Sequence, residues 1–151
     1  MFQIKLLTII LFWVLTFIVL ASCTCVKLPS YLSNQEYNST DIIVKAKVLY
    51  TRLMEDKKHS FTVFKIMENY KPEVKEKVIK IISPIDPESC GISFEANQDW
   101  LLFAYKKDTV YTTSKCTRSM EFIDQKDYKL YTDSFIKTYH KNILFLKSKL
   151  N

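Results

Sequence analysis

The sequence predicts a small, mainly β domain in which five short strands form a barrel and an amphipathic helix follows at the C-terminal end. Three observations predict this fold class: segments of alternating hydrophobicity, one continuously apolar segment, and a change to helical periodicity near the end of the chain. The chain has 151 residues, of which 48% are hydrophobic, and it contains no internal repeat. We therefore expect one folded domain after an N-terminal targeting segment.

Five segments have the hydrophobic pattern of β-strands. In the first of them (DIIVKAKVLY), Val44, Ala46 and Val48 alternate with lysines, as is typical of a strand with one buried face. The segment WLLFAY is continuously apolar, and we expect it to be a central strand that is buried on both faces. The charged residues 51–58 predict a hairpin loop. The five expected strands are 41–50, 59–69, 77–82, 100–105 and 109–114.

The C-terminal segment has a different period. From Tyr128 onward, apolar residues recur at steps of three and four with lysines between them, so residues 128–150 predict an amphipathic helix. We expect its apolar stripe to pack on the strands; the alternative is a helix that dimerises or reaches a membrane, with Phe135 and Leu146 exposed. Five strands and a helix make the five-stranded OB-fold barrel the natural candidate. The stripe consists of Tyr131, Phe135, Tyr139, Ile143, Leu146 and Leu150.

Residues 1–22 are expected to be a cleaved export signal. Lys5 is the positive charge that precedes the apolar segment 6–20, and small residues lie just before Cys23, where a signal peptidase would cut. An uncleaved anchor is the lesser alternative, because the apolar segment is shorter than the roughly 20 residues that a membrane helix needs. Residues 20–23 also match a bacterial lipoprotein box, in which the Cys23 thiol carries lipid. Membrane contact is expected only in these two cases, and the protein is otherwise expected to be secreted.

Four cysteines follow the signal, an even number that predicts two disulfides in an exported chain. A bridge between Cys23 and Cys25 would close a strained small ring, so each of them is expected to reach a distant partner, Cys90 or Cys116. The other alternative is a zinc site of four cysteines, but the sequence lacks the paired CxxC motifs that are typical of such sites. Gly91 is the only glycine of the chain, and beside a crosslink it would allow close backbone approach or a positive φ.

Together, several of these motifs resemble one known family. They are the segment Cys23-Thr24-Cys25-Val26, the strand 42–48, the Cys90-Gly91 pair and Cys116. With this set, the chain resembles the N-terminal, netrin-like domain of the tissue inhibitors of metalloproteinases over residues 23–118, and residues 119–151 are a helical extension. The resemblance implies an OB-fold barrel in which Cys23 pairs with Cys90 and Cys25 pairs with Cys116.

The resemblance also implies a secreted inhibitor of zinc metalloendopeptidases. The α-amine and carbonyl oxygen of Cys23 would chelate the zinc of the protease, at the position that a catalytic zinc keeps open for water. Thr24 would enter the specificity pocket of the protease. Cys25, Val26 and the pair Glu88-Ser89 would lie along its substrate cleft. Metal would bind Cys23 only in the complex with a protease, and no cofactor is implied.

The alternative function is an exported or lipid-anchored OB-fold binding module without inhibitory activity. The formal charge of +6 and the aromatic content of 14% are compatible with a glycan or cell-envelope partner, while export argues against nucleic acid. The chain has no cysteines for the third disulfide of the family domain, and residues 119–151 replace the family's second, cysteine-rich domain. An enzyme is not expected, because no nucleophile motif or phosphate loop is present. Asn38 begins a glycosylation sequon, otherwise a polar loop.

Overall fold

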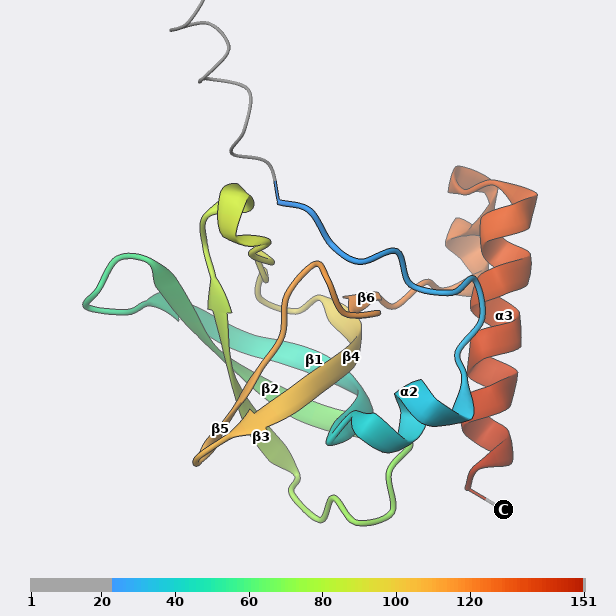
Figure 1. Cartoon of the computed structure of the whole chain (residues 1–151), viewed down its shortest axis with the longest axis horizontal. Helices are drawn as coiled ribbons and strands as arrows, with labels where there is room; N and C mark the ends of the chain where they lie inside the picture. Colours follow the sequence, from blue (N-terminus) through green and yellow to red (C-terminus); the bar gives the residue numbers. More distant parts are fainter. Residues whose placement is uncertain (1–22, 151) are drawn as a thin grey trace, which may run out of the picture.

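The structure, a computed structural model, describes residues 23–150, and the export signal predicted for residues 1–22 lies outside them. The predicted fold class is confirmed at the level of a mainly β domain with a C-terminal helix (Figure 1). Five strands of a six-stranded sheet pair in a ring, in the order β1-β2-β3-β5-β4 and back to β1. All of these pairs are antiparallel except β3–β5, which is parallel.

The six strands are β1 (Ile42–Leu53), β2 (His59–Asn69), β3 (Val78–Pro84), β4 (Asp99–Lys107), β5 (Val110–Thr112) and β6 (Met120–Glu121). The helices are α2 (Asn34–Ser39) and α3 (Asp133–Ser148), and two short 3-10 helices are η1 (Pro87–Ser89) and η2 (Gln125–Leu130). All five predicted strands are present.

Two features of the strands differ from the prediction. β1 continues to Leu53, because residues 51–53 pair with Ser60, Phe61 and Thr62 of β2, so the predicted hairpin loop of 51–58 shortens to 54–58. The Thr51 and Thr62 hydroxyls also bond across the two strands at 3.0 Å. The sixth strand, β6, pairs with β4 at Trp100 and Leu101 and was not predicted. Two residues are too few to show an alternating pattern.

The helices also differ from the prediction. The helix predicted for 128–150 begins at Asp133, because the Thr132 side chain accepts a backbone N–H of its first turn and so caps it. The preceding residues form η2 instead. The short helix α2 was not predicted, since Tyr37 is its only buried residue and six mostly polar residues show no helical stripe. Its cap is Ser33, which accepts from the Glu36 N–H.

The continuously apolar strand separates two cores, as predicted. Leu102 and Ala104 of β4 point into the ring, while Leu101 and Phe103 belong to a second cluster on the outer face of the sheet. The ring interior also contains Ile42, Val44, Ala46, Val48, Phe64, Ile79, Ile81, Ile92, Phe94 and Tyr111. The outer cluster also contains Leu32, Tyr37, Ile43, Tyr70 and Leu146, so α2 and α3 cover this face.

The predicted stripe of α3 packs on the sheet through its middle. Tyr139 and Leu146 are buried and Ile143 packs against the outer core, whereas Phe135 and Leu150 stay partly exposed at the two ends. Of the alternative with Phe135 and Leu146 exposed, the Leu146 part is wrong, whereas Phe135 is 37% exposed. Within residues 23–150, no helix is long and apolar enough to span a bilayer.

Candidate functional site

The N-terminal segment 23–31 crosses one end of the ring without joining the sheet (Figure 1). Residues 23–29 belong to no helix or strand, and Val26 is 88% exposed. Thr24 and Cys25 are exposed as well, and Cys23 is half-buried. Because no strand pairing holds this segment, covalent and side-chain contacts determine its position.

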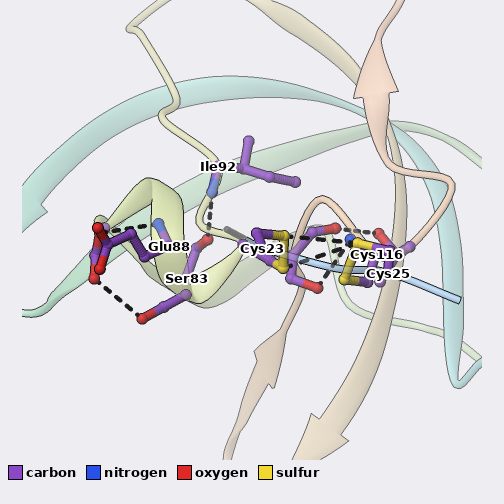
Figure 2. The surroundings of a disulfide bond; sticks show 11 residues. Cys23, Cys25, Ser83, Glu88, Ile92 and Cys116 are labelled. Carbon is purple, nitrogen blue, oxygen red and sulfur yellow. Dashed lines mark hydrogen bonds between the residues drawn. A yellow bond between two sulfur atoms is a disulfide. The ribbon is translucent and has the colours of Figure 1, made fainter. Parts of the chain in front are cut away.

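Two disulfides fix the start of the segment. Cys23 is bonded to Cys90 and Cys25 to Cys116, with 5.1 Å between the Cα atoms in each pair. The expectation of two long-range bridges is confirmed, and the pairing is the one that the family resemblance implies. Figure 2 shows the two bridges side by side where the segment passes the loops that follow β3 and β5. The two bridges use all four cysteine thiols, including the Cys23 thiol that would carry the lipid in the lipoprotein alternative.

The four sulfur atoms lie within 4.8 Å of one another. Such a spacing would suit a metal ion, but each thiol is already oxidised in a bridge, and zinc binds cysteine only as the thiolate. The predicted preference for disulfides over a four-cysteine zinc site therefore agrees with the structure.

The loop of η1 is the second part of the site. Its conformation depends on Asp86, whose Oδ1 accepts from the Glu88 N–H at 3.0 Å and whose Oδ2 accepts from the Ser89 hydroxyl at 3.3 Å. At the end of the loop, Cys90 has a φ of 58°, and its carbonyl oxygen accepts from the Lys115 N–H at 2.8 Å. Glu88 and Ser89 remain exposed, directly before the cysteine that is bonded to Cys23.

Gly91 provides close backbone approach, as predicted, but the positive φ belongs to Cys90 and not to the glycine. A Cβ on Gly91 would overlap the Pro84 carbonyl oxygen and lie 2.6 Å from its carbonyl carbon. Backbone atoms cannot move aside as a flexible side chain can. The loop therefore requires glycine at this position.

We expect Gly91→Ala to lower the free energy of unfolding by about 1 to 3 kcal/mol, because the added methyl group must displace the backbone at Pro84. Urea unfolding of the disulfide-bonded protein measures the effect. Ser93→Ala, at an exposed position two residues further on, is the matched control and should change little. Equal unfolding midpoints for Gly91→Ala and the unmodified chain would contradict the close approach.

Arg118 fixes the other end of the N-terminal segment. Its guanidinium donates to both carboxylate oxygens of Glu36, at 2.7 and 2.9 Å, and both side chains are largely buried. It also donates to the carbonyl oxygens of Pro29 and Tyr31. Bidentate pairs of this kind are strong and geometrically specific. Residues 26–28 therefore stay exposed between two anchored points.

No sequence signal indicates this anchor. Glu36 and Arg118 are 82 residues apart, and each has the appearance of an ordinary surface charge. The sequon residue Asn38 is exposed, but it lies in α2 and not in the predicted polar loop.

The structure thus brings together the residues that the resemblance assigns to the site. We use the term disulfide ridge for residues 23–26 and 88–89, which the Cys23–Cys90 bridge connects. Two bridges between distant segments are typical of proteins that mature in an oxidising compartment, which supports export of the domain. No protein-family model and no curated protein matches this chain.

Proposed function

We propose that this chain is a secreted inhibitor of zinc metalloendopeptidases, similar to the tissue inhibitors of metalloproteinases. The observation that carries the proposal is the disulfide ridge: an exposed N-terminal segment is covalently bonded beside a second exposed segment, Glu88-Ser89. A protease cleft accepts an extended chain, and a ridge fixed before binding loses little conformational entropy on docking.

We assign the ring of strands to the OB fold. The order β1-β2-β3-β5-β4-β1, closed through a parallel β3–β5 pair, supports a small five-stranded Greek-key barrel. The contact between β3 and β5 involves only two residue pairs, which agrees with the partly open character of such barrels.

The proposed mechanism begins with removal of residues 1–22, which gives Cys23 a free α-amine. In its neutral form this amine has a lone pair, and together with the Cys23 carbonyl oxygen it can chelate the open position of a catalytic zinc. The bridge to Cys90 holds this chelating end in place. Thr24, exposed between two bonded cysteines, would then enter the specificity pocket of the protease.

The direct test is inhibition of a panel of zinc endopeptidases by protein whose free Cys23 amine has been verified by intact mass and N-terminal sequencing. We expect stoichiometric inhibition that weakens as the pH falls. The unperturbed α-amine has a pKa of about 7.7 to 8.0, and a protonated amine cannot bind zinc; competition by the metal moves the midpoint lower. A serine protease panel is the control. Verified protein that inhibits no zinc endopeptidase would leave only a disulfide-bonded binding module.

A further inference from the structure

The four cysteine sulfur atoms gather at one place, where the two bridges lie side by side (Figure 2). Between the bridges, the Cys25 sulfur lies 3.8 Å from that of Cys23 and 3.8 Å from that of Cys90. All four sulfur atoms, including that of Cys116, are within 4.8 Å of one another. They cannot bind a metal ion while they are oxidised, so this arrangement bears on the reduced chain.

These separations match those of a tetrahedral site of four thiolates. Zinc lies about 2.3 Å from each cysteine sulfur in such a site, which places the sulfur atoms about 3.8 Å from one another. The two distances between the bridges already have this value. Within each bridge, reduction must let an S–S distance of about 2.0 Å open by about 1.8 Å, which rotation of the cysteine side chains can supply. The reduced chain therefore needs little backbone movement to surround an ion.

The loops that carry Cys90 and Cys116 are held together without the bridges. The Lys115 N–H donates to the Cys90 carbonyl oxygen at 2.8 Å. The Cys116 N–H donates to the Ser114 hydroxyl at 3.2 Å, and the Thr117 N–H donates to the Ser114 carbonyl oxygen at 3.0 Å. Reduction of the sulfur atoms leaves these hydrogen bonds unchanged. Two of the four ligands therefore keep their positions in the reduced chain.

The segment that carries Cys23 and Cys25 also has a second attachment. Arg118 donates to the carbonyl oxygens of Pro29 and Tyr31. Cys25 is four residues from Pro29, so it can lie at most about 14 Å from that anchor. Thiols confined in this way have a high effective concentration at the other two cysteines.

We propose that the reduced chain binds one zinc ion through the thiolates of all four cysteines, Cys23, Cys25, Cys90 and Cys116. Thiolate ligands in a tetrahedral arrangement select zinc over harder divalent ions. Two molecules of a dithiol supply the four electrons and four protons that convert the two bridges into four thiols, and each dithiol leaves as a disulfide. Zinc then displaces four protons as the thiolates bind it, so the affinity falls as the pH falls.

Oxidation reverses the binding. Two molecules of glutathione disulfide accept four electrons from the four thiolates, so that both bridges form and four glutathione thiolates and the zinc ion are released. The ion and the crosslinks therefore exclude each other at the same sulfur atoms. Zinc would hold all four thiols at one place before any bridge has formed.

Anaerobic titration with Co²⁺ tests the site, in protein that has been reduced by a dithiol and then separated from it. We expect one Co²⁺ per chain, with the d–d absorption of a tetrahedral thiolate site. Zinc should also protect the four thiols from alkylation and raise the urea midpoint of the reduced chain, because the binding free energy adds to the free energy of unfolding. Glutathione disulfide should then release one zinc ion per chain as both bridges form.

Single substitutions distinguish this site from binding by the Cys-x-Cys pair alone. Cys90→Ser and Cys116→Ser should each weaken zinc binding to the reduced chain by at least about tenfold, since even the loss of an outer partner of a metal ligand typically costs that much. A site made of Cys23 and Cys25 alone would be insensitive to both changes. Unchanged affinity in these two variants would therefore overturn the proposal.

The matched control is His59→Gln. His59 Nδ1 and Asp56 Oδ2 are 2.6 Å apart and form another pair of potential metal ligands, so this variant should bind zinc as the unmodified chain does. Loss of binding in His59→Gln, or tetrahedral absorption in the disulfide-bonded protein, would assign the ion to a different site. Absence of tetrahedral absorption in the reduced chain would also overturn the proposal. No protease takes part in these measurements, so their outcome is independent of the inhibition assay.

Discussion

Addition of a single alanine before Cys23 is expected to abolish inhibition of a zinc endopeptidase and to leave the fold and both disulfides intact. The extension converts the α-amine of Cys23 into an amide nitrogen, which has no lone pair available for zinc. It also places a residue where the metal would lie. Segment 23–29 forms no part of the sheet, so an added residue disrupts no strand pairing.

The inhibition constant of the extended protein, measured beside that of the verified Cys23 amine form, checks this expectation. Thr24→Ser is the matched control and should keep most of the inhibition, whereas Thr24→Arg should weaken it by obstructing the specificity pocket. Non-reducing peptide mapping must find Cys23–Cys90 and Cys25–Cys116 in every variant. Unchanged inhibition after the extension would exclude zinc chelation by the N-terminus and would leave a different contact to explain any activity.

Removal of the Cys25–Cys116 bridge by a double Cys→Ala substitution is expected to lower the free energy of unfolding by about 2 to 5 kcal/mol. The bridge joins residues 91 positions apart, and the chain-entropy model assigns about 4.6 kcal/mol to a loop of that length. Removal of Cys23–Cys90, which joins residues 67 positions apart, should have a similar effect, because the entropy varies only with the logarithm of loop length.

Urea unfolding of both double variants measures these two contributions. Lys27→Ala, in the same exposed segment but without a bridge, should leave the midpoint unchanged. The two variants should differ in function more than in stability, since Cys23–Cys90 bonds the residue that carries the proposed zinc-chelating groups, whereas Cys25–Cys116 holds the segment two residues further on. Equal stability of the unmodified and bridge-free chains would mean that Arg118 and the two cores hold the domain without the crosslinks.

The strands could be predicted from the sequence because each has a local hydrophobic pattern. The apolar WLLFAY segment predicted burial on both faces, and Leu102 and Phe103 do enter different cores. The start of α3 was missed, although Thr132 followed by Asp133 is a typical N-terminal cap. In the sequence, the apolar stripe of this helix extends back through residues 128–131. Periodicity alone therefore cannot show that the helix begins only after the cap.

Parts of the site depend on distant contacts, and these could not be predicted. The Arg118–Glu36 pair requires that α2 and the loop before β6 meet, which no local pattern indicates. Likewise, the ring closes through the parallel pairing of Ile81 and Ile82 in β3 with Tyr111 and Thr112 in β5, which no local pattern indicates. The disulfide ridge could be anticipated because its cysteines resemble a family pattern.

The separation of the bonded cysteines imposes an order on biosynthesis. Cys23 and Cys25 precede their partners by 67 and 91 residues, so in the export that we propose they would enter the oxidising compartment as unpaired thiols, before Cys90 and Cys116 arrive. In the folded protein the Cys25 and Cys90 sulfur atoms are 3.8 Å apart, so thiol–disulfide exchange can reach the opposite pairing with little movement of the chain. The yield of correctly paired protein should therefore depend on redox conditions that allow thiol–disulfide exchange.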